Sequence, residues 1–256
     1  MTWRASILTL FPEIFPGPLD ASLLGKARQK NLWALDVHDI REHGLGKHRT
    51  VDDTPAGGGP GMVMRADVAA AAIDAVRKAG DARPLIYLSP RGRPLTQSRV
   101  AALAQGAGAV LFCARFEGLD ERVIQARAME EISLGDFVLA GGEAAALALI
   151  EACVRLIPGV LGDETSMIEE SFSKGLLEHP HYTRPPEFEG AAIPDVLSSG
   201  NHARVEAWRR AQSIERTRQR RPDMYARWWV NDRLSRADEP SPRPRRRRHS
   251  PPNGRG

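Results

Sequence analysis

The chain has 256 residues, of which 42% are hydrophobic and 27% charged, a composition typical of a globular protein and not of a fibrous or disordered one. No apolar run reaches the roughly 18 residues of a membrane span, and Pro12 and Glu13 interrupt the short apolar N-terminal stretch, so we expect a cytoplasmic protein with no membrane partner. Two cysteines, Cys113 and Cys153, cannot form a disulfide framework, and both lie in apolar runs typical of buried thiols.

The net charge of +4 is distributed unevenly along the chain. Residues 1–200 carry 20 basic and 26 acidic side chains, residues 201–235 carry 9 and 4, and residues 236–256 carry 7 and 2. This pattern is typical of a mildly acidic catalytic body with an appendage that binds a polyanion. A solvated helix followed by a loose tail would give the same counts.

Strands and helices alternate through the first part of the predicted structure. Short apolar runs predict buried strands, and stretches rich in Ala and Leu predict helices. In chain order we expect a strand at 3–11, a helix with Leu23, Leu24 and Ala27 on one face, a strand at 32–40, a helix from its cap Asp67 to Gly80, a strand at 84–90, a helix capped by Thr96, a strand at 109–114, a helix at 120–129, a strand within 132–142 and a helix from 143 to about 157. This alternation indicates a parallel sheet covered on both faces, an α/β domain.

A polar loop at 41–65 contains the run Gly57–Gly58–Gly59–Pro60–Gly61. Its length favours a functional loop over a structureless connection. The loop lacks the Lys-Ser/Thr pair of a phosphate-binding P-loop, and it does not match the dinucleotide fingerprint. A flat base held by main-chain groups would suit these glycines, and a mobile surface loop is the alternative.

Three predicted strands end in unusual residues, namely Ser89–Pro90–Arg91–Gly92, Arg115–Phe116–Glu117–Gly118 and Gly141–Gly142–Glu143. Ligands bind beyond the carboxyl ends of the strands in parallel sheets. The small apolar side chains and exposed backbone groups of these turns suit an adenine and a thioether or sulfonium better than a triphosphate. Ordinary turn chemistry explains the Gly and Pro residues, but not their recurrence at three neighbouring strand ends.

Beyond these strands, Arg155 lies near the end of an apolar helix. Its guanidinium can interact with the helix dipole, or it can donate to an oxyanion on a substrate. Glu169 and Glu170 follow; they are solvated by default, and one becomes a candidate general base if this segment folds over a site. His179 and His181 straddle a proline with no cysteine nearby, so we predict no tightly bound metal.

The C-terminal part of the chain predicts two helices and a tail. Asn201 can begin a helix that Pro222 stops, with Val205, Trp208, Ala211 and Gln212 on one face. A second helix at 223–234 supplies Trp228 and Trp229, which we expect to pack on the first. Residues 236–256 are rich in Pro and Arg and cannot build a core, so we expect a disordered tail.

Eight segments in order resemble the bacterial tRNA (guanine-N1)-methyltransferases of the TrmD type, in the SPOUT superfamily. The resemblance extends to about residue 230, and the tail after 235 lies outside it. The segments are LTLFPEIF, DDTPAGGGPGMVM, YLSPRG, RFEGLDERV, EISLGDFVLAGGE, RLIPGVLG, SFSKGLLEHPHYTRP and SGNHARVEAWRR.

The resemblance implies a fold that periodicity alone does not predict, because knotted chains are rare. It implies an α/β fold with a deep trefoil-knot domain at 1–158, a flexible linker at 159–175, a small all-α tRNA-binding domain at 176–235, and the tail at 236–256. It also implies a homodimer with its active site at the subunit interface. The reaction moves a methyl group from S-adenosylmethionine to N1 of the guanine immediately 3′ of the anticodon, and no DNA partner is expected.

The family's functional residues carry over to matching positions of this chain. Donor contacts would come from Tyr87, Leu88, Ser89, Pro90, Gly92, Ala114, Glu117, Ile132, Ser133, Leu134, Gly135, Asp136, Phe137, Val138, Leu139, Gly141 and Gly142. Contacts to tRNA would come from Asp52, Asp53, Gly57, Gly58, Gly59, Ser171, His181, Arg184, Asn201 and Arg209. Arg155 would stabilise charge on guanine O6, and Glu170 would be the general base. The resemblance also implies assistance by Mg²⁺, for which the sequence shows no ligand cluster.

The chain departs from the family at two of these positions. Glu170 stands where the family has aspartate, so base chemistry requires the backbone to adjust by roughly an ångström. Ala114 stands where the family has glycine, a change that is tolerated if φ is negative there. Two other functions remain open: a knotted methyltransferase acting on ribosomal RNA, and a non-catalytic RNA-binding protein of the same fold.

Overall fold

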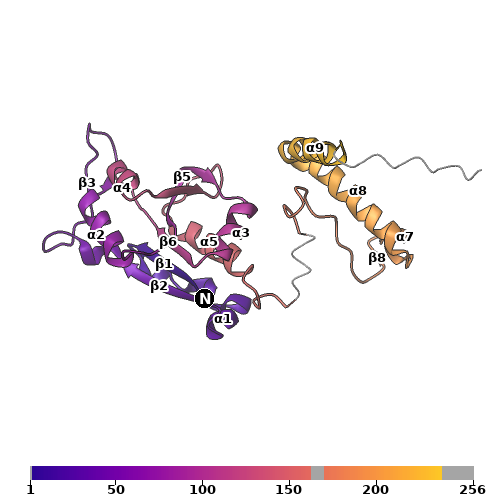
Figure 1. Cartoon of the computed structure of the whole chain (residues 1–256), viewed down its shortest axis with the longest axis horizontal. Helices are drawn as coiled ribbons and strands as arrows, with labels where there is room; N and C mark the ends of the chain where they lie inside the picture. The colour runs from indigo at the N-terminus through magenta and orange to yellow at the C-terminus, as the bar shows by residue number, and fades with distance from the viewer. Residues whose placement is uncertain (1, 163–169, 238–256) are drawn as a thin grey trace, which may run out of the picture. The chain divides into compact units, whose positions relative to one another are not determined.

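The computed structural model describes residues 2–162 and 170–237 (Figure 1). The chain divides into two compact units, Met1–Glu164 and Thr165–Gly256. Most of the predicted tail and the centre of the predicted linker at 159–175 therefore lie outside the described residues. No helix in the described ranges is both long and apolar enough to cross a membrane.

A five-stranded parallel sheet forms the centre of the first unit, with its strands in the order β2-β1-β6-β5-β7. These strands are β1 (Trp3–Thr9), β2 (Trp33–Asp39), β5 (Leu85–Pro94), β6 (Gly108–Phe112) and β7 (Glu130–Ser133). The prediction of an α/β domain with a parallel sheet is confirmed. Strand β7 is shorter than the predicted apolar run, because the chain turns away after Ser133 to form loops.

Buried side chains alternate between the two faces of the sheet. On β6, Ala109 and Leu111 contribute to one core cluster, and Val110 and Phe112 contribute to the other. Side chains of successive strand residues point to opposite faces, so a continuous apolar strand needs cover on both sides. Figure 1 shows helices on either side of these strands.

The helices of the first unit divide between these two clusters. They are α1 (Ser22–Gln29), α2 (Ala66–Val76), α3 (Gln97–Gln105), α4 (Glu121–Ala126) and α5 (Glu143–Val154). Helices α1, α3 and α5 contribute residues to the cluster that contains Leu111, and α2 and α4 contribute to the cluster that contains Phe112. Short 3₁₀ turns occur at Pro12–Ile14, Gly17–Asp20 and Ile40–His43.

Three local predictions for these helices have different outcomes. The Thr96 hydroxyl accepts a hydrogen bond from the Arg99 amide and caps α3, as predicted. Asp67 is not the cap of α2, because the helix already begins at Ala66 and the Asp67 carboxylate pairs with Arg65. Leu23 is 46% exposed rather than on the buried face of α1.

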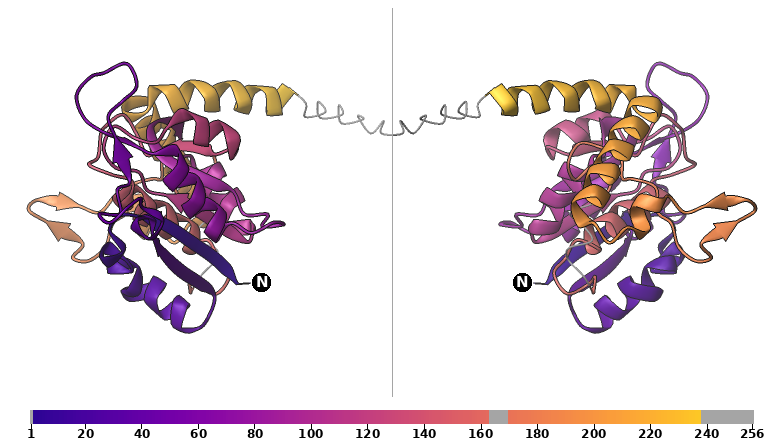
Figure 2. Two further views of the ribbon diagram at one scale, coloured as in Figure 1. Left: turned by 90° about the vertical axis from the view of Figure 1, so that its left-hand side faces the viewer. Right: turned by 90° about the vertical axis from the view of Figure 1, so that its right-hand side faces the viewer.

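The second unit contains three helices and a small β-hairpin among its described residues. The elements are β8 (Glu187–Phe188), β9 (Ala191–Ala192), α7 (Asp195–Ser198), α8 (His202–Arg220) and α9 (Pro222–Ala237). Because β8 and β9 pair antiparallel, the prediction of an all-α domain is wrong in this detail, and both views of Figure 2 show the hairpin. Its turn places Glu189 and Gly190 at φ values of 51° and 78°, which suits a tight hairpin connection.

Helices α8 and α9 pack through a polar and aromatic contact. The Arg210 guanidinium lies 3.0 Å from the Asp232 carboxylate and 6.0 Å from the centre of the Trp228 ring. Trp229, in contrast, is 42% exposed and stacks against Arg233 on its own helix. Of the two tryptophans predicted to pack on α8, Trp228 contacts Arg210 of that helix, and Trp229 is largely exposed.

Candidate functional site

The carboxyl ends of β5, β6 and β7 surround a pocket of about 230 Å³. Its wall consists of three chain segments and one helical residue, namely Tyr87–Arg91, Ala114–Gly118, Ile132–Gly142 without Asp136, and Ala145. The first segment lies within β5, which continues to Pro94 beyond the predicted strand end at residue 90, and the other two continue from the ends of β6 and β7. The structure therefore brings the three turns together at the edge where parallel sheets bind ligands.

A break in the pairing of β5 with β7 forms one side of the pocket. The register between these strands shifts between Leu88 and Arg93, so residues 89–92 bulge out of the ladder. Strand β7 continues beside β5 after the bulge, and the Leu95 amide donates to the Ser133 carbonyl at 2.8 Å. A Cβ atom at Gly92 would overlap the backbone of Glu131 and Ile132, so this close approach requires glycine.

A strained turn forms a second side of the pocket. Phe116 has φ of 59°, an unusual conformation for a non-glycine residue, and Gly118 has φ of 113°. A Cβ atom at Gly118 would lie 2.7 Å from the Tyr87 hydroxyl, which points into this turn. Burial raises the pKa of Tyr87, so the phenol stays protonated and able to donate at neutral pH. Ala114 is not among the positive-φ residues, so alanine is tolerated there.

The glycine loop connects two short antiparallel strands, β3 (Asp52–Asp53) and β4 (Val63–Met64). Gly57, Gly58 and Gly59 have φ values of 90°, 82° and 119°, and a Cβ atom on any of them would meet nothing within 4 Å. The predicted loop is therefore open along its main chain. Glycine is needed here for its backbone conformation and not for packing.

The far end of the glycine loop contacts the pocket turn directly. The Glu117 amide donates to the Met62 carbonyl at 2.9 Å, and the Met64 amide donates to the Gly118 carbonyl at 2.9 Å. Gly61 has φ of 84°, and a Cβ atom there would lie 2.5 Å from Glu117 Oε1. The loop and the pocket thus share the Phe116–Gly118 turn as a common wall.

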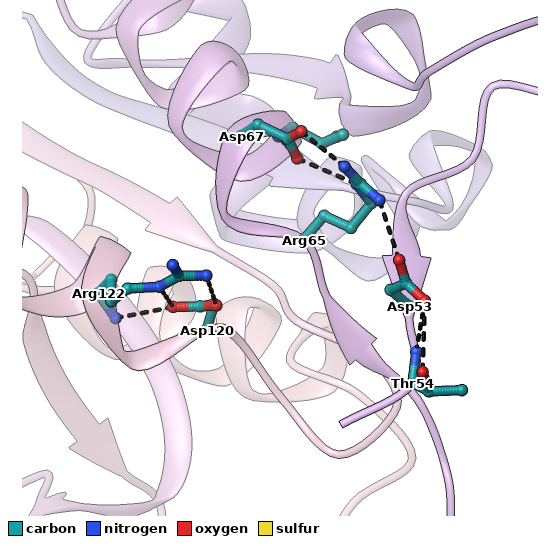
Figure 3. Close-up of polar contacts among 7 residues, drawn as sticks. Asp53, Thr54, Arg65, Asp67, Asp120 and Arg122 are labelled. Carbon is teal, nitrogen blue, oxygen red and sulfur yellow. Dashed lines mark hydrogen bonds and ion pairs between the residues drawn. The ribbon is translucent and has the colours of Figure 1, made fainter. Parts of the chain in front are cut away.

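Charged side chains fix the base of the glycine loop (Figure 3). Arg65 Nη1 lies 3.0 Å from Asp53 Oδ2, and Arg65 Nη2 lies 2.8 Å from Asp67 Oδ2. The hydrogen bond from Arg65 lowers the pKa of Asp67, which therefore stays ionised at neutral pH. Nearby, the Asp120 carboxylate accepts from the amide and guanidinium of Arg122 and caps α4. Because Asp53 is already paired with Arg65, its carboxylate has a structural role besides the predicted contact with tRNA.

A buried ion pair lies behind the pocket wall. Glu143, the first residue of α5, is 3% exposed and accepts a hydrogen bond from the Thr9 hydroxyl at 2.7 Å. Arg115 Nη2 lies 3.0 Å from Glu143 Oε2, and the guanidinium stacks 4.3 Å from the centre of the Phe11 ring. A Cβ atom at Gly141 would lie 2.5 Å from Glu143 Oε2 and still closer to Arg115 Nε, so the turn fits the pair only with glycine there.

Nearly all of the residues predicted to contact the donor line this one pocket. The exceptions are Gly92, which supports the bulge from behind, and Asp136, which is outside the wall. The predicted donor contacts omit six wall residues: Arg91, Arg115, Phe116, Gly118, Ala140 and Ala145. The first four belong to the strand ends that the sequence already marked as a ligand site, whereas Ala140 and Ala145 were not singled out.

The two predicted catalytic residues belong to different units. Arg155 follows α5 in the first unit as its C-cap, is partly buried, and is not part of the pocket wall. Glu170 belongs to the second unit, where its carbonyl accepts from the Ser173 amide and hydroxyl. Within that unit, Glu170 and Arg209 line a cavity of about 460 Å³ between α8, α9 and the segment before them.

The residues predicted to contact tRNA from the second unit also have local structural roles. The Ser171 hydroxyl accepts from the Glu178 amide at 3.1 Å, and His181 Nε2 lies 3.6 Å from Glu178 Oε2. The Asn201 side chain accepts from the Arg204 amide at 3.1 Å and caps α8, as predicted. Arg184 is exposed.

No group of three or more His, Cys, Asp or Glu side chains suited to a metal ion occurs among the described residues. The acidic side chains around the glycine loop instead pair with arginines.

Comparison with known proteins gives consistent matches. The family model described as tRNA (Guanine-1)-methyltransferase TrmD matches residues 3–227. A protein of Rhodopseudomonas palustris (strain BisB18) named tRNA (guanine-N(1)-)-methyltransferase is 64% identical over 88% of this chain and 89% of its own length. Proteins with the same name from Nitrobacter winogradskyi and Mesorhizobium japonicum are 64% and 61% identical over 88% of this chain, and over 94% and 97% of their own lengths.

Proposed function

The chain belongs to the TrmD family of tRNA (guanine-1)-methyltransferases, and from this membership we propose that it methylates N1 of the guanine immediately 3′ of the anticodon, with S-adenosylmethionine as donor. The match across residues 3–227 carries this proposal, because it includes the pocket, the glycine loop and α8 together. A methyltransferase for ribosomal RNA is not favoured, since the relatives are named for tRNA. A non-catalytic protein is not favoured either, because the pocket is intact.

The lining of the pocket suits the chemistry of the methyl donor. Apolar side chains such as Leu88, Ile132 and Leu134 suit an adenine ring, and the turns around them present backbone amides and carbonyls to the ring edges. When bound, the donor supplies a methyl group on a positively charged sulfonium. Glu117 is the one carboxylate in the wall, and its position between the pocket and Gly61 suits it to orient groups on either side.

Two side chains supply the proton chemistry in this proposal. Guanine N1 carries a proton at neutral pH and is a poor nucleophile in that state. Glu170 removes this proton as general base, and Arg155 stabilises the charge that develops on O6 with its fixed fork of N–H donors. Glutamate in place of the family's aspartate retains a carboxylate of similar intrinsic pKa. Mg²⁺ has no assigned residue in this scheme.

The glycine loop is the proposed platform for the target base. Its main chain is open at Gly57, Gly58 and Gly59, so a flat base can approach the backbone without steric hindrance. Asp52 lies in β3 at the start of the loop, and the ion pair of Asp53 with Arg65 anchors that strand. The basic helix α8 and the residues Ser171, His181, Arg184, Asn201 and Arg209 are the proposed tRNA contacts of the second unit.

A knotted chain and a homodimer complete the proposal. The knot rests on the membership of the family. Apolar side chains at the pocket rim support a partner subunit there, since Phe116, Phe137 and Val138 are 49%, 55% and 83% exposed. The catalytic centre would then form at the interface between subunits.

Methylation of tRNA transcripts in vitro tests this function. Purified protein and S-adenosylmethionine with a labelled methyl group are mixed with a transcript that has guanine 3′ of the anticodon, and with a matched transcript that has adenine there. We expect label only in the first transcript, at N1 of that guanine. Equal labelling of both transcripts would contradict the proposed position. Labelling of neither transcript, with label in ribosomal RNA in a parallel reaction, would contradict the substrate class.

A further inference from the structure

Glu143 is a buried carboxylate behind the donor pocket, and the reaction described above gives it no part. It is 3% exposed, and its two oxygens differ: Thr9 donates to Oε1 at 2.7 Å, whereas Oε2 accepts no hydrogen bond from the described residues and lies 3.0 Å from Arg115 Nη2 in an ion pair. Removing a carboxylate from water costs free energy unless it is paired. Glu143 is nevertheless charged and buried directly after the Gly141–Gly142 turn, which suggests that its charge has a function.

Arg115 connects this carboxylate to the pocket. It is part of the pocket wall, whereas Glu143 lies behind it. The Arg115 guanidinium is held over the Phe11 ring and donates weakly to the Ala140 carbonyl at 3.4 Å. Within the described ranges, Glu143 is the only carboxylate in an ion pair with Arg115. The position of this positive charge is therefore fixed, and its neutralisation depends on Glu143.

The other charged side chains of the pocket wall, Arg91 and Glu117, have neighbours other than Glu143. Arg91 lies 3.3 Å from both Glu121 and Glu131, so it has carboxylate partners outside the pocket. Glu117 faces Gly61 at the glycine loop. Arg115 is thus the positively charged wall residue whose charge is balanced by a single buried carboxylate, that of Glu143.

The charge of the ligand changes during methyl transfer. The donor is a sulfonium with a positive charge on sulfur, and the product S-adenosylhomocysteine is a neutral thioether at that atom. An arginine without a counter-charge would repel the sulfonium but not the thioether. The pocket would then bind the product in preference to the donor and would be inhibited by it.

We propose that Glu143 is a specificity-determining positioning residue, which neutralises Arg115 so that the pocket accepts the sulfonium donor without favouring the neutral product. This inference rests on the proposed function, because it takes the pocket as the donor site. Two neighbours fit this ion pair: the Thr9 hydroxyl donates to the Glu143 carboxylate, and Gly141 has no side chain that would collide with Glu143 or Arg115.

Calorimetric titration of the full chain with S-adenosylmethionine and with S-adenosylhomocysteine tests this role. We expect Glu143→Gln to shift the ratio of the two dissociation constants about tenfold toward the product, since a unit charge roughly 10 Å from another at an effective dielectric constant near 20 changes affinity by that order. The double variant Glu143→Gln/Arg115→Gln restores neutrality and should return the ratio to that of the unmodified protein. Arg115→Gln alone should shift the ratio in the opposite direction.

Thr9→Val is the matched control, because it removes the hydrogen bonds of the Thr9 hydroxyl to Glu143 and from the Phe11 amide and changes no charge. We expect it to alter the ratio by less than about twofold, whatever it does to the melting temperature. The inference is overturned if Glu143→Gln weakens both ligands equally, or if the double variant keeps the shifted ratio. If the unmodified protein binds neither ligand, the proposed function fails instead. If Glu143→Gln does not fold, the double variant and Arg115→Gln still decide the sign of the effect.

Discussion

Gly61 is the single residue at which the glycine loop meets the Phe116–Gly118 turn of the pocket. Its hydrogen atoms face the Glu117 carboxylate, and any side chain would displace that group. We expect Gly61→Ala to reduce methyl transfer at least tenfold, because a displacement of about an ångström at a reacting centre has effects of this size or larger. The Michaelis constants for donor and tRNA, measured separately from kcat, show which side of the shared turn is disturbed.

Gly80→Ala is the matched control for this change. Gly80 has φ of 85°, against 84° for Gly61, but a Cβ atom there meets nothing within 4 Å. Both variants should lose similar stability, of order 1–2 kcal/mol, from the left-handed backbone alone. Equal activity of the two variants would show that the contact with Glu117 has no functional role.

Glu170 and Arg155 carry the proton chemistry in the proposed mechanism. We expect Glu170→Ala and Arg155→Ala to bind S-adenosylmethionine with unchanged affinity and to lose at least a hundredfold in kcat, as is typical for removing a general base or an oxyanion donor. Single-turnover methylation of a tRNA transcript measures the chemical step, and calorimetry measures donor binding. Near-full activity of Glu170→Ala would show that another group removes the N1 proton.

Among secondary-structure elements, an ion pair at the start of β5 links stability to pH. The Arg83 guanidinium lies 2.7 Å from the Asp81 carboxylate and also donates to the Ser6 hydroxyl of β1. Hydrogen bonding from Arg83 lowers the pKa of Asp81. Because the folded pKa is below the unfolded one, this pair stabilises the protein fully above about pH 4–5 and loses its effect as pH falls through the folded pKa.

Chemical denaturation at pH 7 and at pH 3 tests this linkage. We expect Asp81→Asn to have a lower free energy of unfolding than the unmodified protein at pH 7. At pH 3 the two free energies should lie closer together. Glu13→Gln, which changes an exposed carboxyl on a 3₁₀ turn, serves as the control. In this variant the free energy of unfolding should change between pH 7 and pH 3 by the same amount as in the unmodified protein. A constant deficit of Asp81→Asn at both pH values would disprove the linkage.

How far the elements follow from the sequence depends on how local their causes are. Continuous apolar runs with Ala-rich stretches between them predict the alternation of strands and helices and the meeting of three strand ends at one pocket. The cap Thr96 is equally local, since one side chain accepts from a backbone amide three residues later. These features need only the residues that lie next to one another.

Other elements depend on contacts that periodicity does not contain. The β8–β9 hairpin turns at Glu189–Gly190, which lacks the Asn-Gly or Asp-Gly signal of tight hairpins, so residue patterns do not predict it. The exposed Trp229 follows from the orientation of α9, which adjacent Trp residues cannot specify. The bulge at 89–92 depends on the register with β7, a strand about 40 residues later in the chain.

For the whole molecule, the unequal distribution of charge suggests how tRNA is held. The acidic residues predominate before residue 200, and the positive charge is concentrated in the last 56 positions. A polyanion would therefore bind through α8, α9 and the arginine-rich C-terminal residues and not through the acidic residues before them.

Shortening the chain tests the contribution of its last residues. We expect a chain ending at Ser235 to bind tRNA more weakly and with a shallower dependence of log affinity on log salt, because each lost phosphate contact reduces the slope by roughly 0.7–0.9. Replacement of Arg245, Arg246, Arg247 and Arg248 by serine keeps the length and should have most of the same effect. An unchanged slope in both variants would show that these arginines do not contact phosphates.

The bulge of β5 and the glycines around it limit which substitutions the pocket can accept. The wall is shaped by the courses of three backbone segments, and glycine at positions 92, 118, 141 and 142 lets them approach so closely. Ala114, in contrast, has a methyl group in the same wall and is not at positive φ. Side chains on the exposed rim, such as Val138, can therefore be replaced with less steric conflict than these glycines. A competitive inhibitor that hydrogen-bonds to these backbone segments would leave the enzyme few substitutions by which to become resistant.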